Sequence, residues 1–418
     1  MFLKKLFNKR KGEKVVLKNT FMQYILYIAQ MVFPLITLPY LTRVLSVDSY
    51  GIYTYSGTCM TYITLIVNYG FILSSTRDIV NTNGDKKAIS YIHSQVFLAK
   101  MLLTIVSSVI LVAMMLCIKI LQGYELFLFL MFVGTVLNAF LPDYLFRGIE
   151  KMEVITYRFL ICKTITTLLT FVLIKDQTDY MMLPVLNIVN GGIALILSVI
   201  WERREGYRIY LVRIIDALKT LKDGFVHFVS QSASTAFNAM NTFIIGLFLV
   251  ASDIAYWGAA IQLISAAQGL YGPISTSLYP HMIRTKKLSL IKKVLMVLIP
   301  CVILAALVCF LLSDFIISTF YGDQYNSAVY IFEILLIVLI LAFPAVMLGW
   351  PTLGAISKAK EITVTSIVSA TFQVVALLLL GVTGNFSLIA VCIVRVCTEA
   401  VLLLGRIYFC FKYRKEFN

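Results

Sequence analysis

Charged side chains are scarce in this chain, and their scarcity excludes a water-soluble fold. Only 14% of the 418 residues are Asp, Glu, Lys or Arg, whereas 60% are hydrophobic and the mean hydropathy is +0.89. Soluble domains carry about 25% charged and roughly 45–50% apolar residues. A soluble chain of this size could not bury so much apolar surface, because its accessible surface is too large. The composition therefore predicts a polytopic membrane protein.

The side chains that carry most enzyme and metal chemistry are few or scattered. His93, His227 and His281 are isolated at predicted helix ends, and the sequence contains no G-x-S-x-G, P-loop or H-E-x-x-H motif. The eight cysteines form no C-x-x-C pair and nearly all lie inside apolar runs, which favours packing over disulfide or metal roles. We therefore expect neither an enzyme nor a metal or cofactor site.

Long apolar runs fill the rest of the sequence. About 20 apolar residues span a bilayer as a helix, and on that template the sequence predicts twelve spans joined by short loops. The basic start of the chain resembles a signal peptide, but the helix that follows lacks a small-residue cleavage site, so we expect it to be retained. The predicted spans are 19–42, 50–73, 91–118, 124–146, 154–174, 180–201, 225–250, 254–280, 291–313, 328–350, 361–381 and 386–410.

Basic residues outnumber acidic ones, with 36 Lys and Arg against 21 Asp and Glu. Thirty of the 36 fall in segments assigned to one side of the membrane, three fall in the opposite loops, and Lys100, Lys163 and Arg395 lie within spans. Because this asymmetry sets membrane orientation, we predict that both termini are cytoplasmic. The same distribution argues against a nucleic-acid partner for the positive charge.

An internal repeat relates the two halves of the chain. VLSVDSYG (44–51) recurs as LVASDIAYWG (249–258), and GIEKMEVIT (148–156) as GAISKAKEIT (354–363), at nearly the same offset. An even number of spans separates equivalent helices, so the halves share one orientation, and two such bundles are typical of transporters. The predicted organisation is a basic N-terminus, a six-helix lobe, a basic linker, a second six-helix lobe and a tail, at 1–18, 19–201, 202–222, 223–410 and 411–418.

Polar side chains share one face of the first predicted span and one face of the seventh. Gln23 and Gln30 are seven residues apart, and Gln231 and Asn238 occupy the equivalent positions in the second half. Lipid cannot satisfy these amides, so both faces must contact protein or water. We interpret them as walls of a central cleft that contact substrate, with hydrogen bonds in a dry core as the alternative.

Basic side chains within or beside the spans indicate the chemistry of the substrate. A charge at mid-helix costs roughly 2.5–3.5 kcal/mol on insertion scales, so Lys100, Lys163 and Arg395 need a reason to be there. Their surplus predicts a lumen that binds phosphate or pyrophosphate. Three further arginines at helix ends could reach the same lumen or anchor in lipid headgroups: Arg43, Arg77 and Arg147.

Acidic side chains are few in the predicted spans. Asp143, Glu333 and Glu399 could couple transport to H+ or Na+, although no clustered pair singles out a site. Asp143 and Arg147 are four residues apart, as are Arg395 and Glu399, so each pair could instead form within its own helix. The sequence leaves both roles open.

Four segments resemble the Wzx-type flippases, which are polysaccharide biosynthesis proteins of the multidrug/oligosaccharidyl-lipid/polysaccharide exporter superfamily. The resemblance extends over the whole chain and is most specific in its first third. The segments are N-x(10)-Q-x(3)-PLITLPYLTRVLSVDSYGIY (ending at 53), NYGFILSSTRDI (68–79), FLPDYLFRGIEKM (140–152) and FYGDQY (320–325). Positions that recur in the family's motifs are occupied here by Arg43, Asp48, Gly51, Arg77, Asp143, Arg147 and Gly148.

The resemblance implies an all-α fold of two six-helix lobes around a central cavity in a bacterial inner membrane. It also implies a function, which is to move an undecaprenyl-pyrophosphate-linked glycan of O-antigen or capsule type from the cytoplasmic to the outer face by alternating access. The implied partners are that glycan, membrane lipids, and the polymerase and chain-length regulator of the same pathway. No cofactor is implied beyond H+ or Na+ coupling or the membrane potential.

Two other classes of membrane protein compete with this interpretation. A multidrug or small-molecule antiporter of the same superfamily would need a coupling carboxylate and a lumen suited to cationic drugs, which the predicted positive lumen disfavours. A membrane-embedded polysaccharide polymerase would need a large outside loop with catalytic arginines, whereas the outside loops here are short.

Overall fold

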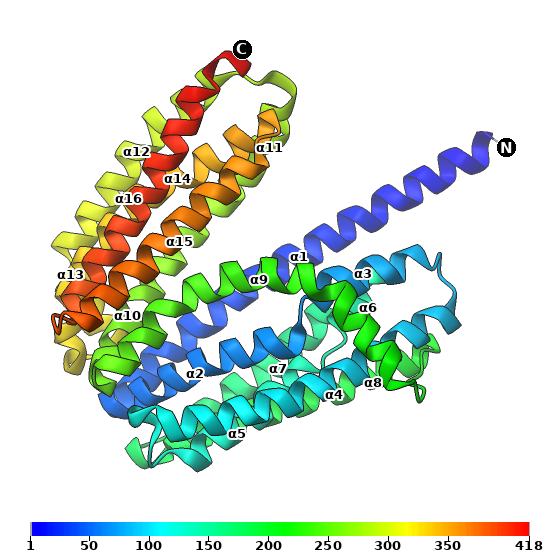
Figure 1. Cartoon of the computed structure of the whole chain (residues 1–418), viewed down its shortest axis with the longest axis horizontal. Helices are drawn as coiled ribbons and strands as arrows, with labels where there is room; N and C mark the ends of the chain where they lie inside the picture. Colours follow the sequence, from blue (N-terminus) through cyan, green and yellow to red (C-terminus); the bar gives the residue numbers. More distant parts are fainter. Residues whose placement is uncertain (1, 418) are drawn as a thin grey trace. The chain divides into compact units, whose positions relative to one another are not determined.

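The computed structural model describes the backbone of residues 2–417, and side chains at residue 15 and in 17–229, 231–232 and 239–417. Within this part of the chain the secondary structure is helical throughout, without a β-strand (Figure 1). The chain divides into two compact units, one formed by Met1–Leu45 and Ser56–Ala239 and the other by Ser46–Tyr55 and Met240–Asn418. The predicted all-α polytopic fold is confirmed.

The first unit contains the helices of the N-terminal half. They are α1 (Phe2–Val44), α2 (Val47–Asn68, whose first residues belong to the second unit), α3 (Phe71–Asn81), α4 (Lys86–Cys117), α5 (Glu125–Ala139), α6 (Asp143–Gly148), α7 (Met152–Leu173), α8 (Met182–Glu205) and most of α9 (Ile214–Phe248). Helix α8 packs against both α5 and α7, and α1 packs against α7 (Figure 1).

The second unit is built around one helix that is apolar almost throughout, with Glu333 as its one charged residue. Helix α14 packs against α10, α12 and α16, and most of its residues are buried, as expected for a helix without a polar face. The helices of this unit are α10 (Ala251–Gly269), α11 (Tyr271–Thr285), α12 (Leu288–Leu311), α13 (Ser313–Tyr321), α14 (Val329–Leu348), α15 (Ala359–Val382) and α16 (Leu388–Lys412). Short 3₁₀ segments join several helices across the chain, and a π-helical turn occupies Gly349–Leu353.

Every predicted span corresponds to a helix or to consecutive helices, but three spans predicted as continuous are broken. The span predicted at 50–73 breaks at Tyr69 and Gly70, which have positive φ angles of 43° and 74°. The span predicted at 124–146 breaks before Pro142, which has no N–H to continue the ladder. The third break, at Leu270, separates α10 from α11.

Ten helical segments of the described chain are long and apolar enough to cross a membrane. The two predicted spans without such a segment, 225–250 and 254–280, correspond to α9 and to α10 with α11. Helix α9 begins at Ile214, so it takes up the end of the stretch predicted as linker.

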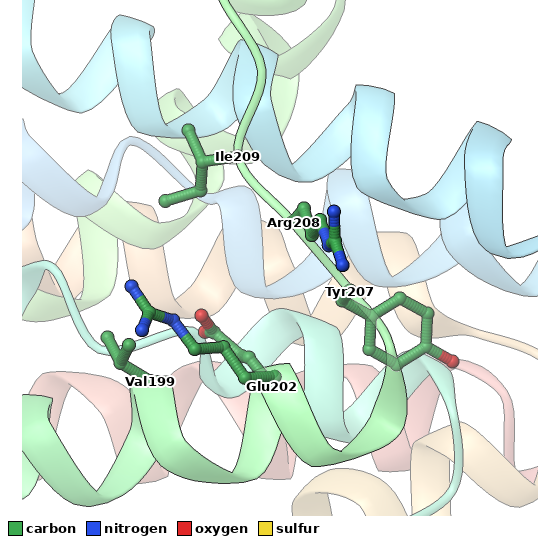
Figure 2. Close-up of a pocket in the computed structure, with 6 residues that line it drawn as sticks. Val199, Glu202, Tyr207, Arg208 and Ile209 are labelled. Carbon is green, nitrogen blue, oxygen red and sulfur yellow. The ribbon is translucent and has the colours of Figure 1, made fainter.

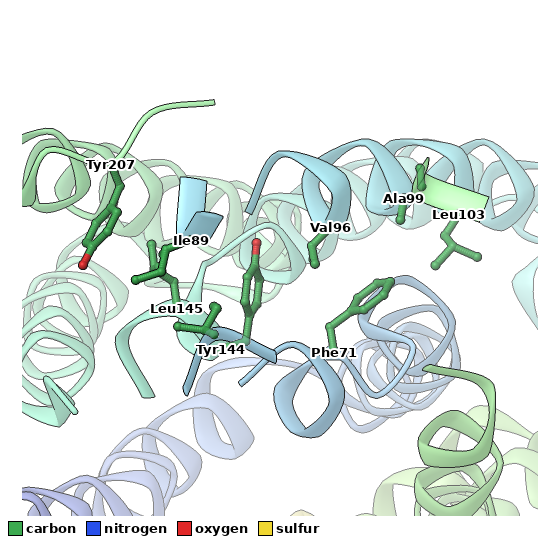
Figure 3. Packing of buried hydrophobic residues seen from close by; sticks show 10 residues of the cluster. Phe71, Ile89, Val96, Ala99, Leu103, Tyr144, Leu145 and Tyr207 are labelled. Atoms are coloured by element: carbon green, nitrogen blue, oxygen red, sulfur yellow. The ribbon is translucent and has the colours of Figure 1, made fainter. Parts of the chain in front are cut away.

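A core of aromatic and aliphatic side chains holds α3, α4 and α6 together in the first unit (Figure 3). Phe71 from α3, Val96 from α4 and Tyr144 from α6 are at most 2% exposed and point into this core. Tyr207, which follows α8, closes the same cluster. The break between α5 and α6 therefore allows Tyr144 to reach the core between the longer helices.

Gly51 permits the close approach of α2 to the start of α10 within the second unit. A Cβ atom at Gly51 would lie 1.9 Å from the backbone oxygen of Ala251, and a backbone atom cannot move aside as a side chain can. We expect Gly51→Ala to lower the free energy of unfolding by about 3 kcal/mol, the upper end of typical overpacking costs. Gly57→Ala in the same helix is the control, because nothing lies within 4 Å of its Cβ position. Melting temperatures in detergent measure both; equal melting of the two variants would contradict the prediction.

Candidate functional site

Lys100 lies inside the first unit and not on an open surface. The side chain is in the middle of α4, is 2% exposed, and its Nζ donates a hydrogen bond of 2.5 Å to the carbonyl oxygen of Ala139. Ala139 is the last residue of α5, where carbonyl groups have no helical donor and carry the negative end of the helix dipole. Lys100 therefore satisfies the end of α5 in this conformation, and its predicted contact with substrate stays a prediction.

Asp143 forms its ion pair with Arg158, not with Arg147. Arg158 Nη2 lies 2.5 Å from Asp143 Oδ1, and Arg158 Nη1 donates to Ser198 Oγ at 2.9 Å. The sequence left a pairing of Asp143 with Arg147 open, but Asp143 begins the short helix α6 and pairs with Arg158 on α7. The Nε of Arg147 is buried and has no hydrogen-bond partner among the described residues.

His93 is buried in the same region and joins α4 to α6 and α8. Its Nδ1 lies 2.7 Å from the hydroxyl of Tyr144, and its Nε2 lies 3.6 Å from Oε2 of Glu202. The expectation that His93 is isolated at a helix end is wrong, since α4 begins at Lys86 and places it well inside the helix. The ammonium nitrogen of Lys100 also lies 5.3 Å from the centre of the Tyr144 ring, over its face.

These contacts form a polar network of two neighbouring sets: Lys100, Tyr144, His93 and Glu202 join α4, α6 and α8, and Asp143, Arg158 and Ser198 join α6, α7 and α8. Two basic residues, Lys100 and Arg158, stand against two acidic ones, Asp143 and Glu202. His93 Nε2 is buried and has no hydrogen-bond partner among the described residues, whereas Lys100 and Arg158 are hydrogen-bonded, and removing one partner of such a buried contact is costly. These contacts hold the helices of the first unit in a fixed geometry. They do not give this region a surplus of positive charge.

The other basic candidates of the first unit lie apart from this network. Lys163 on α7 is half-buried, and among the described residues its ammonium has neither a hydrogen-bond partner nor an ion pair. Arg77 is exposed and pairs with its neighbour Asp78 at 3.0 Å. Arg43 is exposed at the end of α1, and Gln30 is exposed on the same helix. Lys163 is thus a candidate cation whose ammonium is available to an anionic ligand.

Helix α9 carries the two polar candidates of the seventh predicted span. Gln231 is half-buried in this helix. The side chain of Asn238 lies outside the described residues. Their role as a wall of a cleft remains a prediction.

The candidates of the second unit have partners within that unit. Arg395 Nη2 lies 3.3 Å from Glu399 Oε2, four residues further along the same helix, which is one of the two roles that the sequence left open. Glu333 accepts a hydrogen bond of 2.7 Å from the hydroxyl of Ser313. Among the residues with described side chains, no group of three or more His, Cys, Asp or Glu could hold a metal ion.

Sequence reasoning missed Arg158, His93 and Glu202 as members of a site. Arg158 is one of the thirty Lys and Arg that the sequence assigns to the cytoplasmic side, although it lies inside the span predicted at 154–174. A charged residue one turn inside an apolar helix is a signal in itself, because such a charge requires a partner. Glu202 and His93 had no comparable signal, since their contact depends on how α8 packs beside α4.

Comparisons with known proteins agree with this architecture. A family model described as polysaccharide biosynthesis protein matches residues 16–286. A putative O-antigen transporter of Escherichia coli strain K12 is 27% identical over 314 residues, covering 72% of this chain and 74% of that protein.

Two solved structures are similar to almost the whole chain. The lipid II flippase MurJ, in an inward closed conformation, has a TM-score of 0.64 at 13% identity and covers 94% of this chain and 87% of its own. An inward-facing multidrug resistance transporter of the MATE family and MOP superfamily also has a TM-score of 0.64, at 11% identity, with coverages of 92% and 98%. At these identities the two structural matches show the fold alone.

Proposed function

Because the chain belongs to the polysaccharide biosynthesis protein family, we propose that it is a flippase for undecaprenyl-pyrophosphate-linked oligosaccharide repeat units. It is a multi-pass membrane transport protein and not an enzyme. In the proposal, the glycan headgroup crosses from the cytoplasmic to the outer face of a bacterial inner membrane while the prenyl tail stays in lipid. Both termini are then cytoplasmic, and the polymerase and chain-length regulator of an O-antigen or capsule pathway receive the product.

The observation that carries the proposal is the family match over residues 16–286 together with the relative described as a putative O-antigen transporter. The likeness to a lipid II flippase adds that this fold is compatible with a lipid-linked glycan. The multidrug antiporter shares the same fold, so the fold does not separate the two functions. Their substrates differ in charge, and this difference makes them distinguishable by experiment.

We assign the contact with the pyrophosphate first to Lys163. Its ammonium is half-buried on α7 and has no partner among the described residues, so an incoming anion would not need to displace a carboxylate. Arg395 already pairs with Glu399, and Lys100 holds the end of α5. Amide side chains such as Gln30, Gln231 and Asn238 would contact the sugars.

Reconstitution of the protein into liposomes with a fluorescent lipid-linked oligosaccharide tests this proposal. Headgroup accessibility to a membrane-impermeant enzyme gives the rate of translocation. We expect Lys163→Gln to slow translocation by roughly 30-fold or more, since losing one partner of a buried charge pair typically costs 2–5 kcal/mol. Lys163→Arg retains the charge and should keep most of the rate, and Lys175→Gln, an exposed lysine in a loop, is the control.

The outcomes separate the role of Lys163 from the function itself. If Lys163→Gln translocates the glycolipid at the wild-type rate, the assigned pyrophosphate contact is wrong. The proposed flippase function would not be affected by this result. Wild-type protein that moves a cationic dye but not the glycolipid would contradict the flippase and favour the antiporter.

A further inference from the structure

A cavity of about 480 Å³ lies in the first unit at the point where α8 ends (Figure 2). Its volume is in the range of roughly 300–1,000 Å³ that is typical of small-molecule sites. One wall is the end of α8 and the other is the extended segment that follows it. The lining residues are Val199, Glu202, Arg203, Tyr207, Arg208 and Ile209.

Hydrogen bonds hold both walls of this cavity in place. Gly206 turns the chain at the end of α8 with a φ of 86°, and Tyr207 N donates to the carbonyl oxygen of Glu202 at 2.9 Å. The extended segment then runs along α4, where Arg208 N donates to Ser90 Oγ at 3.3 Å and Tyr210 N donates to Ser94 Oγ at 2.8 Å. Both serines are 1% exposed, so the segment is attached to the interior of the unit.

The charges in the cavity favour an anion. Arg203 and Arg208 are exposed, and neither guanidinium has an ion pair or a hydrogen-bond acceptor among the described residues. Glu202 is 6% exposed and lies 3.6 Å from His93 Nε2, on the inner side of the site. Burial, with the nearby Glu205 carboxylate, raises the pKa of Tyr207, so its phenol stays neutral. The lining therefore contains two arginines and a single, buried carboxylate.

Apolar side chains border the same cavity. Val199 and Ile209 line it, and Figure 2 shows them on the helix and on the extended segment respectively. Ile200, which follows Val199 on α8, is 43% exposed, and Leu211, two residues after Ile209, is fully exposed. Basic groups beside exposed apolar side chains are the pattern of a surface that meets lipid headgroups and the upper part of their acyl chains. A site for a free, fully soluble phosphate compound would not need the apolar border.

We propose that this cavity binds the phosphate headgroup of an anionic phospholipid, with its acyl chains beside Ile200 and Leu211. The distribution of Lys and Arg predicts that this end of α8 faces the cytoplasmic leaflet, whose negative surface charge matches the two arginines. Bound lipid joins the end of α8 to α4 through the segment that both already contact. The site is separate from Lys163 and from the transported glycan.

Native mass spectrometry of the full-length protein in detergent, titrated with phosphatidylglycerol or phosphatidylcholine, tests the proposal. We expect selective retention of phosphatidylglycerol, and a roughly 30-fold weaker affinity in Arg203→Ala/Arg208→Ala, as the loss of two basic groups at a membrane surface implies. Arg204→Ala removes an equally exposed arginine that does not line the cavity, and its affinity should stay unchanged. Ile209→Glu keeps both arginines but adds a carboxylate to the lining, and it should also weaken binding.

Three results would overturn the lipid site. They are equal retention of phosphatidylcholine, unchanged affinity in a double variant that elutes as a single species, and displacement of the lipid by glycerol 1-phosphate at equal concentration. The last result would assign the cavity to a soluble phosphate compound. Should the double variant aggregate, Ile209→Glu decides the outcome on its own.

Discussion

Replacing Asp143 by alanine is expected to lower the free energy of unfolding by about 3–5 kcal/mol, the typical cost of leaving one charge of a buried pair without its partner. The side chain of Arg158 is only 4% exposed, and among the described residues the hydroxyl of Ser198 is the one partner it would retain. The penalty arises on the arginine, because the side chain of Asp143 itself is 28% exposed. Melting temperatures in detergent, followed by size-exclusion chromatography after heating, measure the loss.

A double variant separates a structural role of Asp143 from a role in ion coupling. Asp143→Ala/Arg158→Met removes both charges, and replacing a buried ion pair by apolar groups is often neutral, so we expect most of the stability to return. If translocation returns with stability, Asp143 acts as the partner of Arg158. If stability returns but translocation does not, Asp143 or Arg158 has a further role in transport.

The exposed pair of Arg77 and Asp78 is the matched control for this prediction. Exposed ion pairs contribute roughly 0–1 kcal/mol, so Asp78→Ala should change the melting temperature little. If Asp143→Ala has the same melting temperature as the wild type, Arg158 must contact solvent or another partner in the variant. The ion pair would then not contribute to the stability of the first unit.

Most of the fold could be predicted from the sequence, because hydropathy and the distribution of Lys and Arg both follow from the membrane itself. The helices at the predicted spans depend on backbone groups that lipid cannot satisfy, so apolar length is sufficient to find them. The breaks were missed for a different reason. Pro142 can be recognised in the sequence as a residue that interrupts a helix. The reason for a glycine at position 70 cannot, because a Cβ atom there would lie 2.9 Å from the backbone of His227, and only the structure shows this contact.

The candidate site was harder to predict because its partners come from distant parts of the chain. The spacing of four residues allowed Arg395 to pair with Glu399, and the structure shows that pair, because both residues lie on one helix face. The same spacing allowed Asp143 to pair with Arg147, but Asp143 pairs with Arg158, because a carboxylate at the start of a short helix can turn to a neighbouring helix. The spacing of residues in the sequence predicts contacts within one helix. Contacts between α6 and α7 can be predicted only when it is known how the two helices pack.

The membrane potential should by itself shift the steady-state distribution of the transported glycolipid by roughly 10³-fold per 100 mV, if the proposed flippase works without ion coupling. A pyrophosphate diester carries about two negative charges, and each is worth about 2.3 kcal/mol per 100 mV, favouring exit from a negative interior. The acids proposed for ion coupling all have partners here: Asp143 pairs with Arg158, Glu399 with Arg395, and Glu333 accepts from Ser313. A potassium diffusion potential across proteoliposomes, with accessibility of the headgroup as the readout, measures the shift.

The charge of the substrate provides the control for this last prediction. A glycolipid with a single phosphate moves about one charge, so its distribution should shift only about 50-fold per 100 mV under the same conditions. Lys163→Gln should slow the approach to both distributions without changing either, because the protein's own charges return to their starting positions in each cycle. If the steady-state distribution does not change with the potential but changes with a pH or sodium gradient, transport is coupled to an ion. Asp143, Glu333 or Glu399 would then have to exchange its present partner for an ion during transport.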